Sequence, residues 1–263
     1  MLKKLMRYDF ENIFKFLCIF YSLAVVFGVL KRLTSGIGDS LVIEIISEIF
    51  NGAAISMLCS TLINNVMRMW VRFKSNLYGD ESYLSHTLPV TKCAHYLSKI
   101  FTTVITLFVS FLVVGAVLFI MYYSKDSIQM IKGILDPLAT LYDSSVVAIL
   151  IVFIFILFIE FTNVLQCGFT GIILGHRMNN AKTGFSVLYG LITFLASQTV
   201  VLAIVFVIAL FNKDFMVLFT NNTAISIDVI KVVLLVTILS YTFINLALCF
   251  INIKLFKKGV NVD

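Results

Sequence analysis

The chain has 263 residues, of which 60% are hydrophobic and only 13% are charged, and its mean hydropathy is +1.02. A soluble globular domain of this length needs far more charge to cover its surface, so the composition excludes that class. The formal net charge of +6 does not indicate a nucleic-acid partner, because the basic residues fall where a membrane topology places them.

Stretches without charged residues predict an all-α, polytopic membrane protein with six transmembrane helices. A bilayer core about 30 Å thick needs roughly 20 apolar residues per helix. The first stretch is shorter, but it can span if the lysines at its two ends reach back to the headgroups. The fourth and fifth stretches are long enough to project from the membrane. The six predicted spans are Phe16–Leu30, Ile49–Met67, Ile100–Ser124, Ser144–Gly175, Thr183–Asn212 and Val232–Ile253.

Residues 1–15 predict an amphipathic helix that leads into the first span. Apolar side chains recur at every third or fourth position on one face, and charged side chains occupy the other face. Such a helix lies in the membrane interface with its lysines near anionic headgroups, so lipid is an expected partner. A plain basic flank of the first span is the alternative. The apolar face comprises Leu2, Met6, Phe10, Ile13 and Leu17, and the charged face comprises Lys3, Lys4, Arg7, Glu11 and Lys15.

The distribution of basic residues predicts that both termini are cytoplasmic. With the N-terminus inside, 14 of the 20 Lys and Arg residues fall on the cytoplasmic side and six fall outside. Cytoplasmic loops of membrane proteins carry this excess of positive charge. The passage between the second and third spans, Gly79–Ile100, therefore lies in the cytoplasm.

Gly79–Ile100 predicts a short helix set between two long ones. Asp80 or Ser82 can cap its start, and Pro89 ends it because proline lacks the backbone N–H and crowds the preceding turn. Thr91 can cap the next helix, which continues into the third span. The exposed face of the short helix is expected to comprise Tyr83, Leu84, Thr87 and Leu88. A solvated loop between two spans is the alternative.

The second span should carry this short helix clear of the headgroups. A helix from Leu41 to Phe73 is roughly 50 Å long at 1.5 Å per residue, which is well beyond the hydrocarbon core. A soluble partner protein would then be able to bind the short helix.

The order Gly-acidic-acidic-x-Tyr-Leu-x-x-x-Leu-Pro-Val-Thr from Gly79 to Thr91, followed by Ser98–Lys99 and an apolar span, resembles the first intracellular loop of ABC-2-type permeases. These are six-span membrane subunits of ATP-driven exporters. The resemblance implies that residues 79–92 form the coupling helix that sits in a groove of a separate ATP-binding subunit. The residues that match this loop are Asp80, Glu81, Tyr83, Leu84, Thr87, Leu88 and Pro89.

The same resemblance implies the wider arrangement. Residues 1–263 would be one permease domain without an ATP site, since no phosphate-binding G-x-x-x-x-G-K-[ST] loop is present. ATP and Mg would be bound by two copies of the partner ATPase, and a second permease copy or a related permease would complete the assembly. The chain also resembles, more loosely, small permeases of Gram-positive bacteria that export amphipathic peptides such as phenol-soluble modulins, which implies a bacterial cell membrane. The short segment Asn212–Ile227 departs from family members that carry external re-entrant helices.

Glu160 interrupts the fourth span and is the deepest charge in it. An ionised carboxylate facing lipid is costly, so the side chain should face protein or a wet cavity, or carry a proton. Two interpretations remain open: a structural hydrogen bond with Asn163 or a Ser/Thr side chain, and a place on the translocation path. The polar and small residues on the same face, which should point into the bundle, are Asn163, Cys167, Thr170 and Gly171.

Three further patterns stand in the chain. Glu44, Glu48 and Asn51 recur near the outer end of the second span and predict either a solvated vestibule of the path or a simple polar helix end. Gly190, Thr193 and Ser197 predict a packing face rather than a substrate face on the fifth span. The apolar stripe from Ile128 to Leu138 predicts a short interfacial helix that is ended by or kinked at Pro137.

Metal and disulfide chemistry are not expected. Cys93, His95 and His86 lack the second Cys/His pair of a structural metal site, and the five cysteines are dispersed through the chain. Two other function classes remain: a secondary transporter or channel, which would favour several buried charges or broken helices, and a non-transporting immunity or sensor subunit that binds a peptide.

Overall fold

The computed structural model describes residues 2–37, 40–211 and 227–258, and in this part of the chain it is all-helical. Six of the helices are long and apolar enough to cross a membrane, which confirms the prediction of six candidate spans. The predicted segment Asn212–Ile227 lies almost wholly outside the described residues. The helices of the described chain are α1 (Leu2–Thr34), α2 (Leu41–Leu77), α3 (Ser82–Thr87), α4 (Lys92–Tyr122), α5 (Lys125–Leu141), α6 (Val146–Gly175), α7 (Lys182–Phe211) and α9 (Ile227–Lys257).

The chain separates into two compact units, Met1–Gln129 and Met130–Asp263, and each is described here by itself. The boundary falls within α5. The expectation of one permease domain over residues 1–263 stays a prediction.

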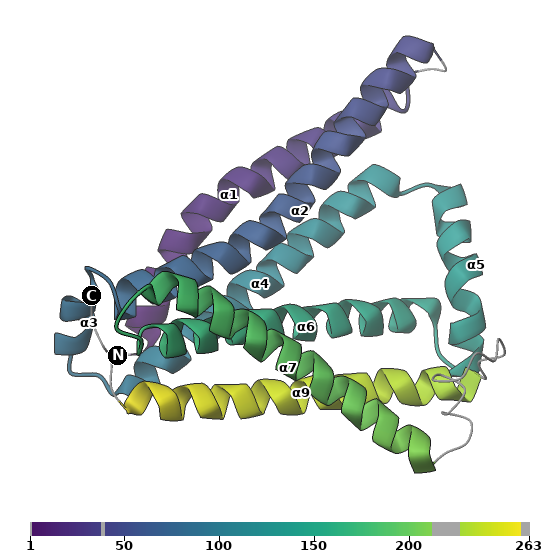
Figure 1. The fold of residues 1–263 in the computed structure, drawn as a ribbon. Coiled ribbons are helices and arrows are strands. Elements are labelled where there is room, and N and C mark those ends of the chain that lie inside the picture. The colour runs from purple at the N-terminus through teal and green to yellow at the C-terminus, as the bar shows by residue number, and fades with distance from the viewer. Residues whose placement is uncertain (1, 38–39, 212–226, 259–263) are drawn as a thin grey trace. The chain divides into compact units, whose positions relative to one another are not determined.

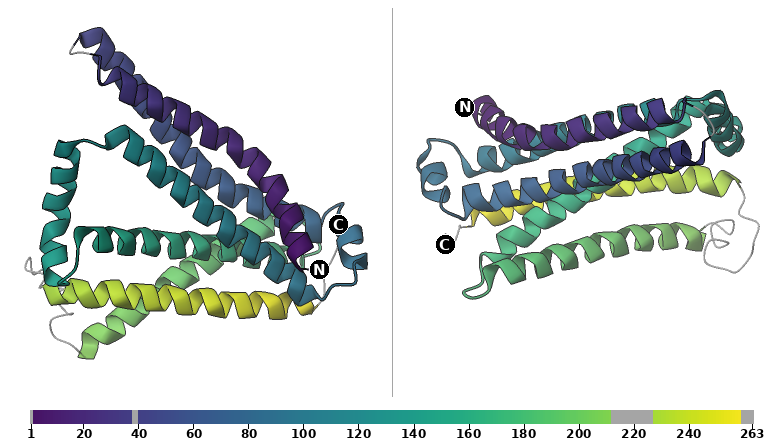
Figure 2. Two further views of the ribbon diagram at one scale, coloured as in Figure 1. Left: turned by 180° about the vertical axis from the view of Figure 1, so that it is seen from behind. Right: turned by 90° about the horizontal axis from the view of Figure 1, so that it is seen from above.

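Unit 1 consists of α1, α2, α3 and α4 and the first turn of α5. Figures 1 and 2 show α1 and α2 side by side, and α4 packs against both. A core of small and apolar side chains joins the three long helices, among them Ala24 of α1, Ala54 of α2 and Val117 of α4. At Gly28 an added Cβ would lie 2.9 Å from Cγ1 of Val117, so the missing side chain lets α1 and α4 approach closely.

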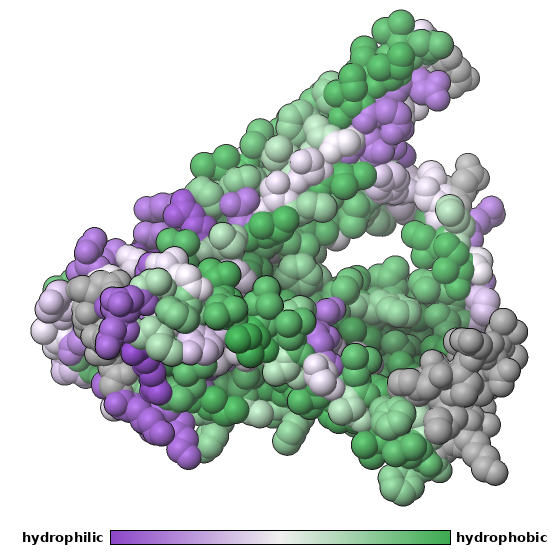
Figure 3. Space-filling view, in the orientation of Figure 1, coloured by the Kyte–Doolittle hydropathy of each residue, from purple (hydrophilic) through white to green (hydrophobic). Residues whose placement is uncertain are grey.

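The long helices of unit 1 extend beyond their apolar stretches. α2 has 37 residues and ends at Leu77 rather than at Phe73, so it is roughly 55 Å long at 1.5 Å per residue. Hydrophobic side chains cover most of the length of α1 and α2 and also their far tip, and hydrophilic side chains lie just below that tip (Figure 3). We call the end formed by the first turns of α1, the last turns of α2, α3 and the first turns of α4 the α3 end.

The predicted N-terminal helix is the first part of α1, which continues without a break into the first span. Ile13 and Leu17 of the predicted apolar face are buried, and Lys3, Lys4, Arg7, Glu11 and Lys15 of the charged face are exposed. The buried face also includes Asp9, one turn before Ile13. The placement of this segment in a membrane interface stays a prediction.

Unit 2 consists of the rest of α5 together with α6, α7 and α9, and α6 packs against both α7 and α9. Ser145 caps α6, because its hydroxyl accepts a hydrogen bond from the N–H of Ala148 at 3.3 Å. The backbones of α6 and α7 nearly touch: an added Cβ on Gly171 would lie 2.7 Å from Cα of Gly190. The stripe Gly190–Ser197 therefore faces α6, as expected for a packing face.

α5 is a helix of 17 residues between the third and fourth candidate spans. It continues past Pro137 to Leu141, so proline does not end it. Met130, Ile131 and Ile134 are exposed large apolar side chains on this helix. The interfacial helix expected there is therefore present as a helix, although its position in a membrane stays a prediction.

Candidate functional site

The predicted short helix is present as α3, which comprises six residues at the α3 end of unit 1. Its two largest side chains are mostly exposed: Tyr83 is 71% exposed and Leu84 is 74% exposed. Thr87, Leu88 and Pro89 are also exposed. A short helix with exposed aromatic and aliphatic side chains is a suitable surface for a protein partner.

The ends of α3 follow its sequence only in part. Leu88 has the extended backbone conformation that a residue before proline favours, and Thr91 caps α4 by accepting from the N–H of Ala94 at 3.3 Å. The prediction that Asp80 or Ser82 caps α3 is wrong. Glu81 holds the cap position and its side chain makes no capping hydrogen bond, because its carboxylate is engaged by Arg72. Asp80 is exposed in the preceding turn, and Ser82 is buried.

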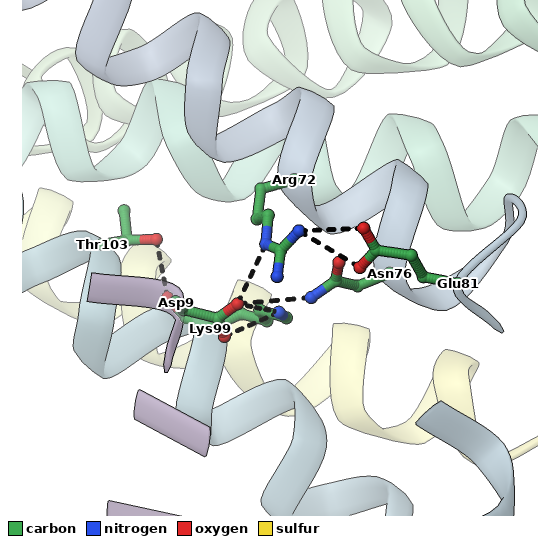
Figure 4. Close-up of polar contacts among 6 residues, drawn as sticks. All are labelled: Asp9, Arg72, Asn76, Glu81, Lys99 and Thr103. Atoms are coloured by element: carbon green, nitrogen blue, oxygen red, sulfur yellow. Dashed lines mark hydrogen bonds and ion pairs between the residues drawn. The ribbon is translucent and has the colours of Figure 1, made fainter. Parts of the chain in front are cut away.

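Asp9 is the centre of a buried cluster of charges at the α3 end (Figure 4). It is only 1% exposed, although it is ionisable. Lys99 of α4 donates to both of its carboxylate oxygens, at 2.7 and 2.6 Å. Arg72 and Asn76 of α2 each donate to its Oδ1 at 3.2 Å. One carboxylate of α1 therefore joins α2 and α4.

Arg72 extends this cluster to the start of α3. Its Nη1 donates to both carboxylate oxygens of Glu81, at 3.2 and 3.1 Å. Its guanidinium lies 5.1 Å from the centre of the Tyr8 ring on α1, which is within the range of a cation–π contact. Arg72 is therefore oriented by α1 through both a carboxylate and an aromatic ring, and it binds Glu81 through Nη1.

The cluster contains two cations and two anions, so its charges balance. Removing ions from water is costly, and a buried ion pair is tolerated only when hydrogen bonds satisfy its members. Asp9 meets this condition with four donor contacts. The Lys99 backbone is held as well, because its carbonyl accepts from the Thr103 hydroxyl at 2.6 Å.

Sequence reasoning did not find this cluster. Asp9 and Arg72 counted only in the charge distribution that predicts topology, while Lys99 counted there and in the Ser98–Lys99 match to the permease loop. The sequence does contain one signal for this cluster: at a spacing of four residues, Asp9 shares a helix face with the apolar residues Ile13 and Leu17. A charge on an apolar face requires a partner, and Lys99 stands directly before the apolar run that begins at Ile100.

A cavity of about 650 Å³ lies beside the charge cluster, under α3. Residues of all four helices line it, including both charged and apolar side chains. The lining residues from α1 and α2 are Lys4, Leu5, Tyr8, Asp9, Asn76 and Leu77, and those from α3, its flanks and α4 are Glu81, Leu84, Ser85, Leu88, Val90, His95, Ser98 and Lys99.

A buried polar seam continues from the cluster between the long helices of unit 1. Asn65 of α2 donates to the hydroxyl of Ser110 on α4 at 2.7 Å, and that hydroxyl also bonds with the Tyr21 hydroxyl of α1 at 2.8 Å. Thr106 of α4 donates to Oδ1 of Asn65 at 3.4 Å. Polar contacts between helices stabilise bundles in lipid, so this seam has a structural explanation.

The candidate path residues on α6 have different surroundings. Asn163 is fully buried, and its Oδ1 accepts from the Ser197 hydroxyl of α7 at 3.0 Å. Glu160 is half-buried, and with the described residues its carboxylate makes no hydrogen bond or ion pair. The structural hydrogen bond expected for Glu160 is therefore not formed within the described chain. Cys167, Thr170 and Gly171 are buried, as their common face predicts.

The candidate path residues on α2 lie in unit 1. Glu44 and Glu48 are exposed, and Asn51 donates to Glu48 at 3.1 Å and accepts from the Tyr122 hydroxyl of α4 at 2.7 Å. Asn51 thus ties the first half of α2 to the end of α4, which favours the interpretation as a polar helix end.

The described residues contain no group of three His, Cys, Asp or Glu side chains close enough to hold a metal ion. All five cysteines are free. His86 uses its Nε2 in a contact with the carbonyl of Leu77 at 3.1 Å, so its role is to hold α3 against α2.

Among known proteins, no protein-family model matches the chain, and neither the curated proteins nor the solved structures contain a significant match.

Proposed function

We propose that the protein is the membrane permease subunit of an ATP-driven exporter, and that α3 is the helix on which its ATPase partner docks. The observation that carries the proposal is the exposure of Tyr83 and Leu84 on a short helix at the end of two long helices. The match of Gly79–Thr91 to the first intracellular loop of ABC-2-type permeases supports it.

In this proposal the chain forms the path through the membrane, and a separate subunit hydrolyses ATP. The chain lacks a phosphate-binding loop, so ATP and Mg belong to the partner ATPase. Two ATPase copies close around two ATP molecules, and one chain offers one α3. Two permease chains, identical or related, are therefore required for a symmetric assembly.

The substrate class follows from the apolar character of the chain and the loose resemblance to small Gram-positive permeases. We propose a hydrophobic or amphipathic substrate, such as an amphipathic peptide, that leaves the cell across a bacterial plasma membrane. In this proposal both termini and the α3 end are cytoplasmic, in accord with the excess of Lys and Arg on that side.

The first test is purification of the full chain from its native membrane. A co-purifying soluble ATPase is the expected result. The double variant Tyr83→Ala/Leu84→Ala should remove two exposed contact side chains and so lose the ATPase, while expression and membrane insertion remain normal. Retention of both ATPase binding and export by this variant would refute the assignment of α3.

The matched control is Ile37→Ala/Leu41→Ala, which truncates two similarly exposed apolar side chains, one after the end of α1 and one at the first residue of α2. It should leave ATPase binding unchanged. Topology provides a second check: a reporter fused after Asp263 should be active in the cytosol. Binding of an ATPase without export would favour the sensor or immunity subunit, and export without an ATPase would favour a secondary transporter.

A further inference from the structure

α3 is separated from two of the three long helices of unit 1 by the 650 Å³ cavity. Leu84 and Ser85 of α3 line one part of this space, while Leu5 and Tyr8 of α1 and Ser98 of α4 line other parts. Close packing therefore does not determine the position of α3 against α1 and α4, because side chains across an open cavity exert no steric restraint on one another.

Besides the burial of Ser82, two polar contacts with α2 hold α3 in place. The Glu81 carboxylate binds Nη1 of Arg72 with both oxygens, and Nε2 of His86 contacts the carbonyl of Leu77 at 3.1 Å. These two contacts attach α3 to the last turns of α2, where aromatic side chains are closely packed. Phe73, Tyr78 and Tyr96 are fully buried there, with the Phe73 ring 6.3 Å from Tyr78 and 6.2 Å from Tyr96.

The contact between Glu81 and Arg72 is connected to all three long helices of unit 1. Arg72 belongs to α2, its Nε donates to Asp9 of α1, and Asp9 accepts from Lys99 of α4. Because Asp9 and the Tyr8 ring fix the guanidinium, Nη1 is already aimed when it meets Glu81. An exposed pair between two flexible side chains would lack this preorganisation.

We propose that Glu81 is a positioning residue: through Arg72 and Asp9 it fixes α3 above the cavity, so that α3 and the first half of α1 hold one distance. The Glu81 side chain is 46% exposed, so its carboxylate can be removed without leaving a buried cavity. Arg72 and Lys99 keep Asp9 as their counter-ion in that variant, and the three long helices are expected to remain folded.

The experiment measures the distance between two spin labels in the purified full chain. One label is attached to Asn12→Cys, an exposed position of α1, and the other to Tyr83→Cys on α3, after replacement of the five native cysteines. Double electron–electron resonance should give one narrow distance in the otherwise unchanged chain. In the Glu81→Gln variant, a broad distribution of label-to-label distances should replace this single distance.

Two controls separate positioning from general loss of structure. Glu11→Gln removes a carboxylate from the exposed pair with Arg7, and the narrow distance should remain. A second label pair, Asn12→Cys on α1 and Lys92→Cys at the start of α4, should stay narrow in the Glu81→Gln chain. The proposal is overturned if Glu81→Gln leaves the α1–α3 distance narrow, or if the α1–α4 distance broadens to the same extent.

This positioning depends only on contacts within unit 1, and its use in docking an ATPase rests on the proposed function. The spin-label measurement needs no partner, so its outcome is independent of the co-purification test. A narrow α1–α3 distance in Glu81→Gln would refute the positioning role and leave the docking surface untouched. Failure to find an ATPase would refute the docking role alone.

Discussion

Units 1 and 2 hold their helices together by different means. At the α3 end of unit 1, Asp9 joins α1 to α2 and α4 through the charged side chains of Arg72 and Lys99. In the middle of unit 2, neutral side chains join α6 to α9: Gln166 of α6 donates to Asn245 of α9 at 3.2 Å. Thr170 of α6 likewise donates to Asn252 of α9 at 2.8 Å.

The difference corresponds to position along the helices. The charged cluster lies where α1, α2 and α4 extend beyond their apolar stretches, whereas the neutral contacts of α6 lie within one. Charges at the centre of a bilayer are costly, whereas amides and hydroxyls can bond across helices there. The comparison teaches that the charged contacts lie outside the apolar stretches and the neutral ones within them, as the contact of Asn65 with Ser110 in unit 1 also does, and the following variants test it.

Asp9→Asn should have the largest effect, because it leaves Arg72 and Lys99 as buried cations without their shared counter-ion. Breaking a buried ion pair costs about 3–5 kcal/mol, so the free energy of unfolding should fall by that amount. Region-resolved hydrogen exchange in detergent micelles should show the loss in unit 1, with unit 2 still protected. Equal loss of protection in both units would contradict the division of the chain into two separately stabilised units. Glu11→Gln, on an exposed face of the same helix, should leave exchange unchanged.

Gly171→Ala should disturb unit 2 by a smaller amount. Its Cβ would lie 2.7 Å from Cα of Gly190, and a backbone atom cannot move aside as a flexible side chain can. Overpacking of this kind costs about 1–3 kcal/mol, measurable by unfolding in mixed micelles. Gly115→Ala of α4 is the matched control. Since no atom lies within 4 Å of its added Cβ, it should be neutral or slightly stabilising. Equal effects of the two variants would contradict the close packing of α6 against α7.

The neutral contacts of unit 2 should be individually weak. A double-mutant cycle with Thr170→Val and Asn252→Leu should give a coupling energy of about 0.6 kcal/mol and no more than about 1.7 kcal/mol, the mean and the maximum found for hydrogen bonds between helices in membranes. The two side chains are buried and bonded at 2.8 Å. A coupling energy as large as the Asp9→Asn effect would remove the distinction between the two units.

Glu160→Gln should have the smallest effect on stability, because the carboxylate makes no hydrogen bond or ion pair with the described residues. If Glu160 lines the proposed path, export should fall, most for basic substrates, while expression and assembly remain normal. Unchanged export by the glutamine variant, with loss of folding only in Glu160→Leu, would leave a structural role for this residue.

The sequence predicted the features that depend on neighbouring residues. Uncharged stretches predicted six candidate spans, Pro89 predicted the end of α3, and Thr91 predicted the cap of α4. These features arise from length, backbone geometry and a local hydrogen bond, all of which can be judged within a few residues of the chain.

The features that the sequence did not predict depend on distant pairs. Asp9 meets Arg72 and Lys99 across 63 and 90 residues of chain. Many acidic and basic residues could form such pairs, and one sequence does not specify which of them meet. A contact outside the local sequence also explains why the cap of α3 was predicted wrongly. The Glu81 carboxylate binds Arg72, nine residues earlier in the chain, instead of a backbone N–H of α3.

The length of α2 has a mechanical consequence. At roughly 55 Å it is nearly twice as long as a bilayer core of about 30 Å, so part of α2 would lie outside the core of a membrane that it crosses, and the proposed function places its last turns and α3 in that part. A tilt of about 10° around the far end of such a rod displaces the other end by roughly 10 Å. Hydrophobic mismatch sets helix tilt in bilayers of different thickness. If α2 crosses the membrane, the position of α3 along the membrane plane is therefore expected to vary with the thickness of the surrounding lipid, and more strongly than its height does.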